Sequence, residues 1–203
     1  MNFTGEYKIP ASREKVWEAL NDVIVLKQCI DGCEELNKDS DTEFSAKVTA
    51  KVGPVKAKFS GKVRLSDIDP PSGYTISGEG QGGVAGFAKG GASVKLVEDH
   101  GQTVLNYEAK AEVGGKLASV GSRLVDGVAK KTADDFFKKF TEIVSSEEKA
   151  ATKEGTEAGA EAEERLTAGS QAPKLDDGGG LSPVVWGIGV LVAVAILLFI
   201  FAG

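Results

Sequence analysis

The chain of 203 residues carries 24 Lys and Arg against 30 Asp and Glu, a formal net charge of −6, and 41% of its residues are apolar. This composition is that of a globular protein, and the net acidity argues against nucleic-acid binding. One His and two Cys exclude a disulfide framework and leave few ligands for a metal site or for His-dependent catalysis.

The N-terminal region predicts one strand and two short helices. Residues 3–9 alternate between apolar and polar positions, as a half-buried strand does. Apolar residues at helical spacing within 16–20 follow Ser12, which predicts a helix with Ser12 as its N-terminal cap. Residues 23–29 predict a second helix.

Strict alternation then marks the segments 43–52, 55–66 and 103–113 as antiparallel strands with one buried face. Turn sequences rich in Gly, Pro and Asp separate the strands. The expected order is one strand, two helices, six strands and a long helix.

One predicted hairpin carries a row of basic residues on its solvent face. They are Lys47, Lys51, Lys56, Lys58, Lys62 and Arg64. Two interpretations stay open. The cations could simply prevent exposed strands from pairing with other chains. Alternatively, they could form a docking face for an acidic protein or for anionic lipid headgroups.

Half of residues 78–91 are glycine, and 78–83 match the G-x-G-x-x-G pattern literally. The dinucleotide fingerprint requires a helix directly after the motif, and residues 84–91 cannot hold one. We therefore expect no nucleotide site. Cys29 and Cys33 lack the second pair or nearby His of a metal site, so we expect reduced thiols and no metal. His100 is expected in a solvated turn.

A long amphipathic helix is predicted from about residue 114 to 144, because apolar residues recur there every three or four positions. An antiparallel sheet curved around this helix would bury both apolar faces, which gives an α+β fold.

Small residues occupy many positions expected to face the interior. They could let the sheet bend, or they could leave an apolar ligand cavity between sheet and helix. The predicted lining of such a cavity is Phe44, Phe59, Gly80, Gly83, Phe87, Leu105, Tyr107, Leu117, Val120, Gly121 and Leu124.

The chain divides into a folded domain (1–144), an acidic linker (145–180) and a C-terminal segment (181–203). The linker has no aromatic residue and is expected to be flexible, with some helix between 146 and 166. Residues 184–202 are uncharged and would form a helix roughly 28 Å long, close to the thickness of a bilayer core.

This segment predicts a single-pass membrane anchor, with Val184, Trp186, Phe199 and Phe201 among its membrane residues. The N-terminus has no basic and apolar leader. The predicted location is therefore the inner or plasma membrane, with the domain facing the cytoplasm.

Four segments together resemble the CoxG family, the G subunits associated with carbon monoxide dehydrogenase, within the START-like (SRPBCC) helix-grip superfamily. They are the glycine-rich run 78–91, the turn 69–74, the segment 113–124 and the segment 29–34, where family members often have Pro at position 31. The resemblance covers about residues 1–144. It implies a sheet gripping a long helix around an apolar cavity, and association with a molybdenum carbon monoxide dehydrogenase that is recruited to the membrane.

The resulting hypothesis is a membrane-anchored accessory protein without catalytic residues or a covalent cofactor. It would bind an apolar lipid such as a prenylated quinone (menaquinone or ubiquinone) and couple the dehydrogenase to the respiratory chain. Its alternative is a recruitment scaffold without a physiological ligand. A third interpretation, an enzyme of the same superfamily such as a cyclase, lacks an acid–base pair in the expected cavity.

Overall fold

The computed structural model describes residues 1–163, with side chains up to residue 146. The predicted anchor, including Val184, Trp186, Phe199 and Phe201, and the linker beyond residue 163 lie outside the described residues. Within residues 1–163, no helix combines the length and apolar character that a membrane crossing requires.

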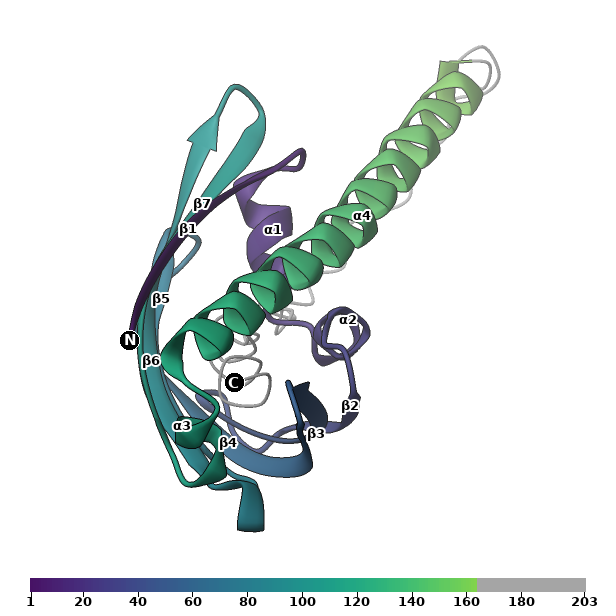
Figure 1. Ribbon diagram of the computed structural model, residues 1–203. Helices are drawn as coiled ribbons and strands as arrows, with labels where there is room; N and C mark the ends of the chain where they lie inside the picture. Colours follow the sequence, from purple (N-terminus) through teal and green to yellow (C-terminus); the bar gives the residue numbers. More distant parts are fainter. Residues whose placement is uncertain (164–203) are drawn as a thin grey trace.

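Seven strands form one fully antiparallel sheet in the order β1-β7-β6-β5-β4-β3-β2. The strands are β1 (Asn2–Ile9), β2 (Cys33–Lys38), β3 (Glu43–Val52), β4 (Val55–Asp69), β5 (Gly73–Gln81), β6 (Phe87–Asp99) and β7 (Gln102–Gly114). The helices are α1 (Arg13–Ala19), α2 (Val23–Cys29), α3 (Lys116–Ser119) and α4 (Ser122–Glu163), with a 3₁₀ turn η1 (Gly83–Ala85). The sheet bends around α4, which crosses its concave side (Figure 1).

The short helices begin where the sequence predicts. Ser12 Oγ accepts a hydrogen bond of 3.3 Å from the amide of Lys15, and Asp22 Oδ1 accepts one of 2.7 Å from the amide of Ile24. These side chains satisfy amides that have no partner within the first turn of α1 and of α2. The expected capping of the first helix by Ser12 is confirmed.

The predicted alternation is confirmed in β3, β4 and β7, whose apolar positions lie on the face toward α4. We call this the inner face of the sheet and the opposite one the outer face. Phe44 on β3 and Val63 on β4, paired in register, are both buried on the inner face. Their neighbours Glu43 and Arg64 point to the outer face.

The long C-terminal helix differs from the prediction at both ends. It is interrupted at Val120 and Gly121, so that the short α3 precedes α4. Gly121 has a φ of +93°, a conformation that non-glycine residues rarely adopt, and this breaks the helix. At its other end α4 continues past Val144 to Glu163, so the partial helix expected between 146 and 166 is present and is continuous with α4.

Three rings from the middle of α4 fill the core. Phe136, Phe137 and Phe140 are at most 1% exposed. Among the strands, α4 contacts chiefly β1 and β3, which lie toward opposite edges of the sheet. The helix therefore crosses over the central strands on the concave side of the sheet. We call the concave side of these central strands, beneath α4, the trough. The residues in the trough determine whether a ligand can bind between sheet and helix.

Candidate functional site

The floor of this trough is a band of small residues on the inner face. Gly78 of β5 pairs with Gly90 of β6, and Gly90 pairs with Ala111 of β7. Beside them Ala92 pairs with Ala109. Sheet and helix normally fill the space between them with large side chains, so small residues here either let α4 approach the sheet closely or leave room beneath it.

The facing stretch of α4 also presents small side chains, because Val125, Ala129 and Ala133 are its buried residues there. Val125 and Ala129 form a separate small apolar cluster with Ala111, apart from the main core. The core is thus divided where the floor consists of glycine and alanine.

The predicted lining residues separate into two groups. The first is buried inside the domain. Phe44 and Phe59 are 1% exposed and Leu105 and Leu117 are 0% exposed; Gly80 and Tyr107 are also buried. A side chain that bordered an open, water-sized cavity would show exposed surface. The four side chains with 0–1% exposure therefore border no such cavity in this structure.

The second group gathers at one end of the domain. Phe87 and Val120 are half-buried, whereas Gly83, Gly121 and Leu124 are exposed, Leu124 by 41%. Three segments meet there: the β3–β4 turn (51–56), the β5–β6 connection (82–87) and the α3–α4 junction (114–124). We call this the loop end. That the two groups line one ligand site stays a prediction.

Two of the glycines make room for aromatic rings. A methyl group at Gly82 would lie 2.2 Å from Cε1 of Phe59, and one at Gly114 would lie 2.2 Å from Cε1 of Phe87. The rings therefore lie directly over these glycine backbones. By contrast, a methyl group at Gly83 or Gly121 would meet no atom within 4 Å. Some of the glycines thus allow an aromatic ring to pack over the backbone, whereas others lie in open space at the end of the domain.

Two hollows lie on the outer face of the sheet. One, of about 850 Å³, has a floor of Gly78, Gly90 and Gly91, and Phe44 is the one predicted lining residue among those that border it. The other, of about 320 Å³, lies beside it, and both are bordered by Lys62 and Glu79. Cations and carboxylates alternate along their walls.

Some of the predicted docking residues form ion pairs with neighbouring carboxylates, and others form none. Lys47 lies 2.8 Å from Glu35, and Lys58 lies 2.6 Å from Glu34, where the hydrogen bond with Glu34 raises the pKa of Lys58. By contrast, Lys51, Lys56 and Lys62 make no ion pair with any described residue.

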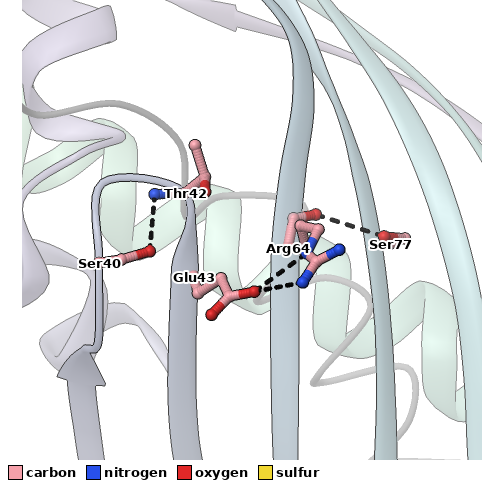
Figure 2. Close-up of polar contacts among 5 residues, drawn as sticks. All are labelled: Ser40, Thr42, Glu43, Arg64 and Ser77. Atoms are coloured by element: carbon pink, nitrogen blue, oxygen red, sulfur yellow. Dashed lines mark hydrogen bonds and ion pairs between the residues drawn. The ribbon is translucent and has the colours of Figure 1, made fainter.

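The third paired cation, Arg64, borders the larger hollow. Its Nε donates a hydrogen bond of 3.0 Å to Glu43 Oε1, and its carbonyl accepts one of 3.5 Å from Ser77 Oγ (Figure 2). Nearby, Ser40 Oγ accepts a hydrogen bond of 3.3 Å from the amide of Thr42. These bonds fix the polar surface on the side of the sheet away from α4.

A polar and aromatic cluster that was not predicted from the sequence lies at the seam between β1 and α4. The hydroxyl of Tyr7 donates a hydrogen bond to Asp134 at 2.7 Å, and the Tyr7 ring stacks on Phe137 with 3.9 Å between centroids. Burial, followed by the bond to Asp134, raises the pKa of Tyr7. A hollow of about 430 Å³ borders these three residues. The sequence feature that could have predicted this cluster is Asp134, a polar residue beside the apolar stripe of the long helix.

The titratable residues considered from the sequence lie apart from these features. Burial raises the pKa of the Cys29 thiol to about 12. The His100 side chain is 97% exposed in a turn, as expected, and its Nδ1 lies 2.6 Å from Asp99. Among the described residues, no cluster of three His, Cys, Asp or Glu side chains could hold a metal ion.

A seven-stranded antiparallel sheet bent around a C-terminal helix, with a trough beneath the helix, defines the helix-grip (START-like) class. The model of the CoxG family, the G subunits of carbon monoxide dehydrogenase, matches residues 5–145. The chain belongs to this family, as its resemblance predicts. No curated protein sequence matches the chain.

Solved structures agree with this assignment. A conserved protein from Geobacillus kaustophilus is 33% identical, with a TM-score of 0.68, over 72% of this chain and 96% of that one. TTHA0849 from Thermus thermophilus is 15% identical, with a TM-score of 0.55, over 72% and 98%. Ara h 8.0201 is 17% identical, with a TM-score of 0.51, over the same shares. The last two support the fold alone.

Proposed function

We propose that this protein is a membrane-anchored, non-catalytic accessory subunit that binds an apolar lipid, a prenylated quinone, and couples a molybdenum-type carbon monoxide dehydrogenase to the membrane. Family membership supports the link to the dehydrogenase. The observation that carries the ligand is the band of glycine and alanine beneath a helix that contacts the sheet toward its edges. A quinone is the apolar electron acceptor that a soluble oxidoreductase would need from a membrane.

The ligand would lie between Ala109 and Val125 and leave through the loop end. Because Leu117 has no exposed surface, α3 must move when a ligand enters. The helix break at Gly121 supplies a point for that movement. Each buried methylene of the prenyl tail would contribute about 0.8 kcal/mol, which must compensate for the loss of the lipid environment.

The test is lipid extraction and mass spectrometry of the full chain purified in mild detergent. The expected result is a prenylated quinone in the wild type, and its loss in Ala109→Leu, whose larger side chain would fill the trough. Asn106→Leu, on the outer face of the same strand, is the matched control and should retain the quinone. The proposal is wrong if quinone is absent both after purification and after reconstitution with menaquinone or ubiquinone.

A recruitment scaffold without a ligand is the second candidate, and the charged hollows on the outer face favour it. Lys62 borders both hollows and Arg64 borders the larger one. Reversing both charges (Lys62→Glu with Arg64→Glu) should abolish co-purification of the dehydrogenase and leave the lipid content unchanged. The control pair, Lys95→Glu with Lys130→Glu, makes the same charge change away from the hollows. Equal loss of the dehydrogenase in both pairs would argue against this docking face.

A further inference from the structure

The loop end combines exposed apolar side chains with unpaired cations. Val84, in η1, is 86% exposed, and Leu124, in the first turn of α4, is 41% exposed. Val84 lies between Gly83 and Gly86, both of which have a positive φ, so the backbone itself projects this side chain outward. Apolar side chains at a protruding tip contribute nothing to the core.

The three segments of the loop end contact one another. A methyl group at Gly53 would lie 2.7 Å from Cδ2 of Leu124, which places the β3–β4 turn against the start of α4. One at Gly115 would lie 2.6 Å from the Cα of Gly86, which places α3 against η1. The exposed side chains therefore belong to one continuous surface.

Charge on this surface has a single sign. Segments 51–56, 82–87 and 114–124 contain four cations, Lys51, Lys56, Lys116 and Arg123, and no Asp or Glu. All four are exposed, and none forms an ion pair with a described residue. Lys51 and Lys56 stand directly opposite each other across the hairpin, an arrangement that costs stability without an anionic partner.

Carboxylates on neighbouring elements do not neutralise this charge. Glu34 is engaged by Lys58 at 2.6 Å, and Glu112 by Lys89 at 3.3 Å. Asp126 of α4 lies beyond the segment and is half-buried. In a chain with a net charge of −6, the loop end is thus a local cationic surface with an apolar tip.

We infer that the loop end docks on an anionic bilayer surface, with Val84 entering the headgroup region and the four cations on lipid phosphates. Cationic and apolar contacts together are what a peripheral membrane surface requires. Docking itself is independent of the ligand. Its use as the route for quinone transfer rests on the proposed function, because Gly83, Gly121 and Leu124 would then border the opening.

Hydrogen exchange of the full chain tests the docking. It is measured by mass spectrometry with phosphatidylglycerol–phosphatidylcholine vesicles and with pure phosphatidylcholine vesicles. Because exchange is read segment by segment, attachment through residues beyond 163 does not enter the readout. Segments 51–56, 82–87 and 114–124 should be protected on the anionic vesicles alone, and added salt should reduce that protection.

Two variants sharpen the test. Each lysine removed should lower the docked population about fivefold, so Lys51→Glu with Lys56→Glu should abolish the protection. Val84→Ser should weaken it at constant charge. The matched pair Lys95→Glu with Lys130→Glu should leave it intact, and unfolding midpoints confirm that every variant folds.

The inference fails if the loop end is protected equally on neutral vesicles or on neither kind. It also fails if protection requires added dehydrogenase, which would make the partner an acidic protein surface. Quinone content, measured in the same samples, separates the two proposals. Quinone retained without protection overturns docking alone, whereas protection without quinone overturns only the proposed ligand.

Discussion

The hydroxyl of Tyr7 donates a hydrogen bond of 2.7 Å to Oδ1 of Asp134 and so connects the edge strand β1 to the middle of α4. The Tyr7 ring also stacks on Phe137 of the same helix. Contacts with β1 and with β3 are the principal ones that α4 makes with the strands of the sheet, and this seam belongs to the first. Its strength therefore helps to hold the helix above the small-residue trough.

Replacing Tyr7 by Phe keeps the ring stack and removes the hydrogen bond. The free energy of unfolding should fall by about 1 kcal/mol, the usual net value of such a bond. Urea denaturation of Tyr7→Phe, Asp134→Ala and the double variant measures it. If the two effects simply add in the double variant, the two side chains are not coupled.

Stability should decline at alkaline pH because buried groups must ionise when the chain unfolds. Burial raises the pKa of Cys29 from 9.0 to about 12, so the folded chain binds this proton more tightly than the unfolded chain. The contribution is complete below pH 9 and is lost as the pH rises toward 12. Denaturation series across this range should show a shallower decline for Cys29→Ala, and an identical slope would contradict the assignment.

The two thiols should differ in reactivity toward a disulfide reagent at neutral pH. Cys33 is half-buried at the start of β2, whereas Cys29 is 1% exposed in α2. Burial also raises the pKa of both thiols, which keeps them in the unreactive protonated form. Cys33 should react first, and Cys29 should react only at the rate of unfolding. Simultaneous modification of both would show that α2 opens readily.

Two glycine substitutions should have opposite effects on stability. Gly82→Ala places a methyl group 2.2 Å from the Phe59 ring and should cost about 1–3 kcal/mol through displacement of that ring. Gly127→Ala, in α4 with open space around it, should stabilise the fold by roughly 0.5–1 kcal/mol. Thermal unfolding of the two variants checks both signs. A neutral Gly82→Ala would mean that the Phe59 ring moves freely.

The order of elements and the faces of the strands could be read from the sequence alone. Alternation fixes which side chains of β3, β4 and β7 point inward, because successive residues of a strand lie on opposite faces. The helix cap at Ser12 follows from local chemistry as well. Residues distant in sequence do not enter such assignments, which explains why these predictions were confirmed.

What the sequence could not decide depends on distances between elements. Periodicity placed Phe44, Leu105 and Leu124 in one lining, but only packing closes the core around the first two and leaves Leu124 exposed at the loop end. The ion pair of Lys58 and the seam between Tyr7 and Asp134 likewise join residues far apart in the chain. Local pattern determines which face a side chain occupies; the curvature of the sheet and the height at which α4 crosses it determine what that face meets.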